Sequence, residues 1–203
     1  MKSKLVAMIV LAFSAITTNA AVIDFESVSS DDFGSPQEIE GFVFDFDASG
    51  WLVGPTTDAF YPDGTTNGTS ILVASGNGAN GNANVTMSQV GGGAFDIFNL
   101  DAASSNLFIG NSLEVTGSYS GGGVVSVILD NLNGTFSNYS LSSFENLVSV
   151  TFTSVTSGGY NEAGFALDNL SLSPTQQVSE PSMLALLGLA LVGAGFIRRN
   201  SKA

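Results

Sequence analysis

Residues 148–153 read Val-Ser-Val-Thr-Phe-Thr, with an apolar side chain at every second position and a hydroxyl side chain between. A period of two is typical of a β-strand that buries one face. The same alternation recurs at 42–47 and 113–119, and glycine-rich turns such as 91–93 and 121–123 separate the apolar segments. Short sequential strands of this kind predict an antiparallel β-sandwich of the all-β class. Strands are expected at 21–26, 42–46, 70–74, 84–88, 94–100, 107–109, 113–119, 124–130, 135–139, 148–152 and 163–172.

The charges of the chain are separated along its length. All 18 acidic residues of the 203-residue chain lie between Asp24 and Glu180, whereas the five basic residues lie in the terminal segments. Residues 21–179 therefore hold 17 carboxylates and no Lys, Arg, His or Cys. This composition excludes nucleic-acid binding, which needs basic residues, and catalysis by Ser-His-Asp, Cys-His or lysine groups. It leaves cation binding through oxygen ligands, hydrolysis by two carboxylates, or no catalysis at all.

The first 20 residues have the layout of a secretory signal peptide. Lys2 and Lys4 precede an apolar run at 5–16, and residues 18–20 supply the small residues that a signal peptidase needs. We expect this signal helix to be removed by signal peptidase after Ala20, so that the exported chain starts with the acidic segment 21–26.

A second apolar segment lies near the other end of the chain. Residues 183–197 carry no polar side chain and are followed by Arg198 and Arg199. As a helix this segment would span about 22 Å, against the roughly 30 Å of a bilayer core. Because basic residues stay on the cytoplasmic side, the acidic domain is expected outside the inner membrane, anchored transiently by this helix.

Residues 178–203 resemble the PEP-CTERM sorting signal, in which a Pro-Glu-Pro motif precedes a membrane helix and a basic stop. Glu180 and Pro181 match that motif, Ser179 stands where the family has proline, and Arg198-Arg199 match the basic stop. The resemblance implies processing by an exosortase-like enzyme in a Gram-negative-type bacterium, with delivery to the cell surface or the extracellular matrix. The expected organisation is a signal peptide at 1–20, a β-sandwich at 21–173, a polar linker at 174–177 and the sorting signal at 178–203.

The middle of the chain is also similar to jelly-roll carbohydrate-binding modules. The likeness lies in the order of an Ile-Asp-Phe-Glu strand, a Gly-Phe-Val-Phe strand before Trp51, and a closing Phe-Ala-Leu-Asp-Asn-Leu strand at 165–170. It implies a polysaccharide ligand and a structural Ca²⁺ where the first and last strands meet, with Asp24 or Glu26 and Asp168 as ligands. Asp168 would share a strand face with Ala166 and Leu170, where an uncompensated charge is costly. The open alternative is that Asp168 caps a turn at the sheet rim.

Three further patterns carry less information. Asp45, Asp47 and Ser49 before Gly50 match the start of a helix-flanked calcium loop, but Thr56 stands where the bidentate Glu is needed.

No pair of carboxylates is marked as catalytic, so we expect a non-enzymatic binding or structural component of exopolysaccharide or biofilm. The alternative is a carboxylate-dependent glycosidase. Five asparagines fit the N-glycosylation pattern, and we interpret them as turn and strand composition: Asn67, Asn84, Asn133, Asn138 and Asn169.

Overall fold

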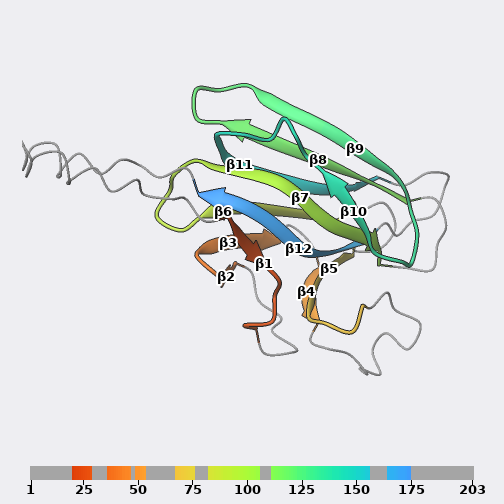
Figure 1. Cartoon of the computed structure of the whole chain (residues 1–203). Helices are drawn as coiled ribbons and strands as arrows, with labels where there is room; N and C mark the ends of the chain where they lie inside the picture. The colour runs from red at the N-terminus through yellow and green to blue at the C-terminus, as the bar shows by residue number, and fades with distance from the viewer. Residues whose placement is uncertain are drawn as a thin grey trace, which may run out of the picture.

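The computed structural model describes residues 20–28, 36–46, 49–53, 67–75, 82–105, 111–155 and 164–174. Within these ranges the chain forms strands joined by turns, as the period-two alternation predicts (Figure 1). In chain order the strands are β1 (Ala21–Ile23), β2 (Gln37–Ile39), β3 (Phe42–Phe46), β4 (Ser49–Val53), β5 (Ile71–Ser75), β6 (Asn84–Gln89), β7 (Phe95–Ser104), β8 (Asn111–Tyr119), β9 (Val124–Leu132), β10 (Ser137–Ser140), β11 (Leu147–Val155) and β12 (Gly164–Pro174).

The strands pair antiparallel and build two layers. One layer runs β2-β3-β6-β11-β8-β9. In the other, β12 pairs with β7 along one side and with β5 and β1 along the other; β4 extends the layer beyond β5, and β10 extends it beyond β7. Among the described strands, one bridge, between Leu147 of β11 and Phe95 of β7, joins the layers. The predicted all-β antiparallel sandwich is thereby confirmed.

The core lies between the two layers. Phe152 of β11 and Phe165 of β12, whose ring centroids are 6.5 Å apart, connect the layers near the middle, and Phe42 of β3 contacts Phe95 of β7 at 5.2 Å. These rings are buried, so each contributes a large apolar area to folding as well as an edge or tilted ring contact. The alternation at 148–153 matches this position of the core, because the apolar side chains of Val150 and Phe152 are buried.

Most expected strands have observed counterparts, and two strands were missed. β2 has three residues, too few to show alternation, and β4 begins at Ser49, within the segment that matches the start of a calcium loop. The strand expected at 107–109 lies outside the described residues. So do residues 1–19 of the expected signal helix and the apolar helix expected at 183–197. Within the described ranges, no helix is long and apolar enough to cross a membrane.

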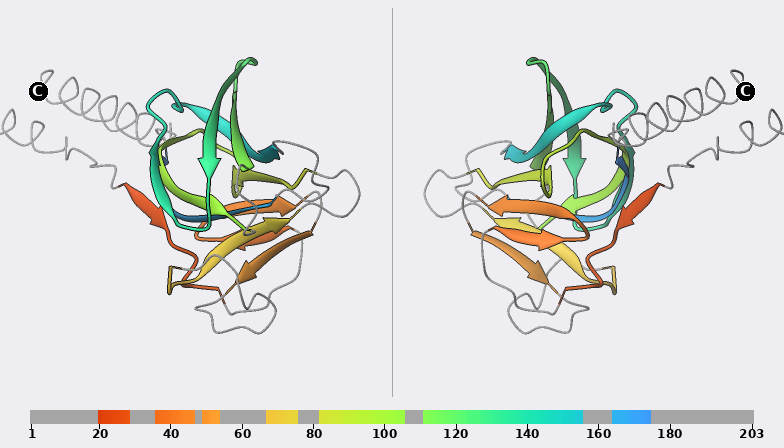
Figure 2. Two further views of the ribbon diagram at one scale, coloured as in Figure 1. Left: turned by 90° about the vertical axis from the view of Figure 1, so that its right-hand side faces the viewer. Right: turned by 90° about the vertical axis from the view of Figure 1, so that its left-hand side faces the viewer.

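A long β-hairpin forms one margin of the sandwich. The β8–β9 hairpin lies at the edge of its layer, with β9 outermost (Figures 1 and 2). Gly122 and Gly123 close the hairpin with positive φ angles of 84° and 93°, which glycine adopts without steric cost.

Candidate functional site

Asp168 of β12 is a buried carboxylate, with 1% of its surface exposed. Four polar groups surround its two oxygens. Asn67 donates through Nδ2 to Oδ2 at 2.6 Å, and the backbone N–H of Asn169 donates to Oδ1 at 2.8 Å. Asn169 Nδ2 lies 3.2 Å from Oδ2, and the Thr69 hydroxyl lies 3.0 Å from the same oxygen. The hydroxyl also contacts Asn67 Oδ1, so its single proton serves one of these two acceptors at a time.

A second carboxylate lies directly across the sheet from Asp168. The antiparallel register of β12 and β7 places Asp168 opposite Asp101. Like charges at opposite positions destabilise a sheet, and here one amide separates them: Asn169 Nδ2 donates to Asp101 Oδ2 at 2.9 Å as well as to Asp168. Asn138 of β10 donates to the other oxygen of Asp101 at 2.8 Å. The two aspartates therefore form one hydrogen-bonded network with neutral amides, which we call the Asp101–Asp168 network (Asp101, Asp168, Asn67, Thr69, Asn138 and Asn169).

A bulge in β12 places Leu170 on the core-facing side of the strand, not on the side that the sequence predicts. Asn169 has a φ of 49°, and the register with β7 shifts between Asp168 and Ser171. Because one irregular residue reverses which side chains face the core, Leu170 packs in the main core together with Phe165 and Leu167. The expectation that Leu170 shares the face of Asp168 was wrong for this reason.

The Asp168 environment favours the protonated carboxyl. Burial is the main cause that raises the pKa of Asp168 above its ordinary value, and the nearby charge of Asp101 raises it further. The hydrogen bonds from Asn67, Asn169 and Thr69 oppose this shift by stabilising the carboxylate. The network thus holds a charge that its surroundings only partly compensate.

Glu26, another predicted calcium ligand, lies close to the same segment as Asp168. β1 pairs with β12, as expected for the first and last strands. Glu26 accepts a hydrogen bond from the backbone N–H of Ser70 at 2.7 Å, while Asp168 binds Asn67 and Thr69, so the segment 67–70 is held by both carboxylates. Asp24 accepts the N–H of Glu26 at 3.1 Å. Burial, followed by the charge of Asp24, raises the pKa of Glu40.

These carboxylates do not form a compact cage in the part of the chain that is described. No group of three acidic side chains that could hold a metal ion occurs among the described residues. Asp45, which belongs to the partial calcium-loop pattern, lies within β3 opposite Thr86 of β6. Asp47 of the same pattern lies outside the described residues. A cation at Asp168 would have to displace donors that the carboxylate already binds.

Sequence reasoning missed Asp101 and the amides that hold it. Three of the five asparagines first interpreted as turn and strand composition, namely Asn67, Asn138 and Asn169, donate to Asp101 or Asp168. The available signal was chemical: a domain with many carboxylates and no basic residues has to satisfy any buried carboxylate with neutral donors.

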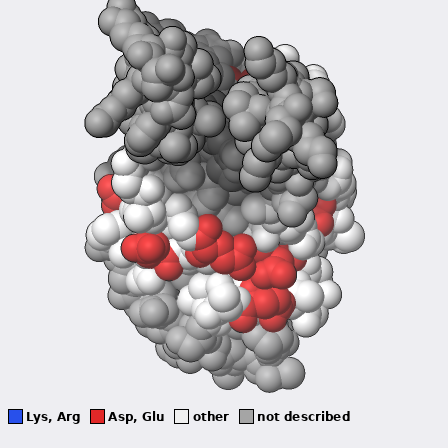
Figure 3. Space-filling model, turned by 60° about the vertical axis from the view of Figure 1, so that its left-hand side comes forward, with Lys and Arg blue, Asp and Glu red and all other residues white. Residues whose placement is uncertain are grey.

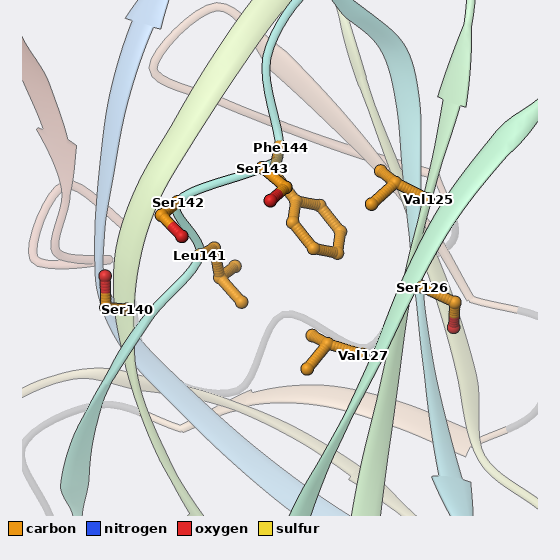
Figure 4. A pocket seen from close by; sticks show the side chains of 8 residues that line it. All are labelled: Val125, Ser126, Val127, Ser140, Leu141, Ser142, Ser143 and Phe144. Carbon is orange, nitrogen blue, oxygen red and sulfur yellow. The ribbon is translucent and has the colours of Figure 1, made fainter.

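A small groove lies between β9 and the turn that follows β10. Its volume is about 200 Å³, below the roughly 300–1,000 Å³ of sites that enclose a small molecule, so it fits only part of a larger ligand. Figure 4 shows its apolar side chains facing one another from the strand and the turn. It is lined by Val125, Ser126, Val127, Ser140, Leu141, Ser142, Ser143 and Phe144.

The described surface is acidic. Figure 3 shows a band of Asp and Glu side chains across one face and no basic side chain among the coloured residues, in agreement with the sequence between residues 21 and 174. Such a surface repels polyanions and attracts cations.

Family comparison identifies the segment that follows the sandwich. Residues 177–199 match the model of the PEP-CTERM protein-sorting motif. The chain carries a PEP-CTERM motif. The sorting signal predicted from Ser179, Glu180, Pro181, Arg198 and Arg199 is therefore confirmed, and the motif marks the chain for export through the exosortase pathway.

Solved structures of similar fold include sugar-related proteins, all at low identity. TmCBM61 in complex with β-1,4-galactotriose is 14% identical, with a TM-score of 0.41, over 66% of this chain and 89% of that one. A family 29 carbohydrate-binding module, CBM29-2 D83A with mannohexaose, is 12% identical, with a TM-score of 0.44, over 79% and 94%. The agarase AgWH50C is 11% identical, with a TM-score of 0.46, over 78% of this chain and 26% of the enzyme. No curated protein matches the sequence.

Proposed function

We propose that this chain is an exported cell-surface or extracellular-matrix protein, whose sandwich is a non-catalytic binding or structural component of exopolysaccharide or biofilm. The observation that carries the proposal is the PEP-CTERM motif at 177–199, which begins shortly after β12 ends at Pro174. An exosortase-like enzyme is the processing partner, signal peptidase acts on residues 1–20, and the 183–197 helix holds the chain transiently in the inner membrane.

The state of the two aspartates argues against hydrolysis by this pair. A general acid has to come within hydrogen-bond distance of the glycosidic oxygen, and a second carboxylate has to reach the sugar or its water. Asp168 is buried and its oxygens are already bound by Asn67 and Asn169, while Asp101 is bound by Asn138 and Asn169. A glycosidase mechanism through this pair would require the network to open.

The charge of the domain supports a neutral polysaccharide as ligand. The middle of the chain has 17 carboxylates and no cationic side chain, so an anionic polysaccharide would be repelled unless cations bridged it. The groove beside β9 offers hydroxyl groups and apolar side chains without a charge, which suits one unit of a neutral sugar chain.

Calcium is the cofactor in this proposal, at Asp168 with Asp24 or Glu26. The donor chemistry fits, because the ligands of Ca²⁺ are oxygens and the carboxylates of Asp168 and Glu26 both bind the segment 67–70. Binding would require the Asn67 amide and the Thr69 hydroxyl to release Asp168. The ion would supply structural support and no chemistry of its own.

Export is tested by the mass of the chain in its producing strain. With the sorting enzyme present, the surface or medium fraction should contain a chain shortened at both ends. Deleting the sorting enzyme should leave the C-terminal segment attached and the chain in the membrane fraction. A full-length cytoplasmic chain in both strains would contradict the proposal.

Activity is tested by a glycan array together with a reducing-sugar assay on the exported chain. The proposal expects saturable binding to a neutral polysaccharide without release of reducing ends. Ser142→Trp, which fills the groove, should weaken binding, whereas Ser120→Trp in the exposed β8–β9 turn is the matched control. Turnover that Asp101→Asn or Asp168→Asn abolishes would establish the glycosidase instead, and absence of both leaves a purely structural surface protein.

A further inference from the structure

β9 (Val124–Leu132) is the longest free strand edge in the described part of the chain. It pairs with β8 on one side, and no described strand pairs with it on the other. The other edge strands are short: β1 and β2 have three residues, β10 has four and β4 has five, against nine in β9. A long edge with unpaired backbone groups is a template for another strand.

The usual protections of such an edge are weak here. Natural sheets place lysine, proline or bulges on exposed edges, and β9 has neither lysine nor proline. Its irregularity comes only at the end, where Asn131 has a φ of 60° and the register with β8 shifts between Asn111 and Leu113. The regular part of the edge is therefore 124–130, and its midpoint is Val127.

The hairpin geometry fixes which backbone groups are free. Tyr119 donates its N–H to the carbonyl oxygen of Gly123, so the hydrogen-bonded pairs with β8 continue at Val125, Val127 and Leu129. The even-numbered residues of 124–130 direct their N–H and C=O groups away from β8. Their side chains are exposed as well, including Val124 at 66% and Ile128 at 52%, the two most exposed large apolar side chains of the described residues.

We propose that β9 pairs antiparallel with β9 of a second copy of this chain, about a two-fold axis at Val127. In this register Val125 faces Leu129 of the copy and the two Val127 residues face each other, so the core-facing row is apolar throughout. Val125 and Val127 are only partly buried in one copy, and pairing removes more of their surface from water. On the outer row Ser126 faces Ile128, and Asp130 faces Val124.

The sequence of β9 is self-complementary about Val127, with apolar residues opposite one another, and this favours a second copy as the partner. Two copies of a domain without basic residues repel each other over most of their surface, but the segment 124–130 carries one carboxylate, Asp130. The proposed register keeps the two Asp130 side chains apart, opposite valines. An isologous two-fold contact of this kind closes on itself and produces a dimer rather than a fibre. Because repulsion opposes it, added salt should tighten the dimer, whereas salt weakens association with a basic partner.

A single introduced cysteine gives a sharp test, because the chain has none of its own. Residues facing each other at a non-hydrogen-bonded antiparallel position have Cα atoms about 4.5 Å apart, within the range that a disulfide spans. Val127→Cys in the full chain, kept in a non-ionic detergent, should form a disulfide-linked dimer on mild oxidation. Ser120→Cys, in the turn of the same hairpin, is the exposed control and should stay monomeric.

Ile128→Pro provides the second test, because it removes an outward N–H without touching the β8–β9 bonds. Sedimentation of the full chain should show self-association about tenfold weaker than in the unaltered chain, while Ile128→Thr, which keeps the N–H, associates normally. Circular dichroism checks that each variant is folded. Cross-linking of Ser120→Cys as fast as Val127→Cys, an unaltered chain that stays monomeric at high salt, or full association of Ile128→Pro would each overturn the proposal.

Discussion

The Asp101–Asp168 network and the β9 edge lie on different layers of the sandwich and break opposite rules of protein burial. The network buries charge, and the edge exposes apolar side chains. Neutral amides from loops and strands far apart in sequence compensate the buried charge, whereas no described residue covers Val124 and Ile128. The contrast shows that neutral amides compensate one buried carboxylate, Asp168, and its half-buried neighbour Asp101, whereas the apolar side chains at the β9 edge stay exposed.

The largest effect should come from removing the buried carboxylate. Asp168→Ala leaves the donors on Asn67, Asn169 and Thr69 without their acceptor, and we expect the free energy of unfolding to fall by about 2–4 kcal/mol. Urea denaturation measures the loss. Ser173→Ala, on the same strand and half-buried, is the matched control and should change stability by no more than about 0.5 kcal/mol. Equal stabilities of the two variants would show that the network contributes nothing.

Calcium should give the next largest effect if it binds at Asp168 with Asp24 or Glu26. At a free concentration about 100 times its Kd, Ca²⁺ should stabilise the folded chain by about 2.7 kcal/mol. Melting curves with chelator, with CaCl₂ and with NaCl at matched ionic strength separate this site from general screening of the acidic surface. A response in Asp168→Asn as large as in the unaltered chain would exclude Asp168 as a ligand.

The raised pKa of Asp168 predicts how stability depends on pH. Between the ordinary carboxyl pKa of about 3.9 and the raised value, the folded state binds more protons at Asp168 than the unfolded state does. This contribution to stability is present at low pH and is lost as pH rises through the folded pKa. Glu40 should act in the same direction.

The pH dependence is measured as the difference between unaltered and Asp168→Asn chains in urea unfolding from pH 4 to pH 7. The unaltered chain should gain stability relative to the variant as pH falls. Glu40→Gln is the control that isolates the second carboxyl. A difference that is constant across this pH range would mean that Asp168 ionises normally in the fold.

The smallest effect on folding should come from the β9 edge. Ile128→Ser replaces an exposed side chain that contacts no core, so the stability of the monomer should change by no more than about 0.5 kcal/mol. Urea unfolding at low protein concentration measures this monomer value, and sedimentation of the same variant should show normal association, as for Ile128→Thr, because the backbone N–H is kept. A large loss of monomer stability would mean that β9 is covered within its own chain, which removes the contrast between the two regions.

Much of the fold could be predicted because alternation is a local property. Phe42, Phe44 and Phe46 of β3 and Val150 and Phe152 of β11 are buried as their spacing predicts. Prediction failed where the strand departs from a period of two: the bulge at Asn169 moves Leu170 to the core, and no local signal in the sequence marks it. β2 and β4 were missed because pairing partners, β3 and β5, define them more than their own residues do.

The sequence by itself determined the class of the protein and its route. Periodicity predicted an antiparallel sandwich, and Glu180, Pro181 and Arg198-Arg199 predicted the sorting motif, because each depends on residues close together in the chain. Only the tertiary structure decided that Asp101 faces Asp168, that asparagines 67, 138 and 169 converge on them, and that β9 is the free edge. Register and edge position arise from pairing between strands distant in sequence, which no local pattern encodes.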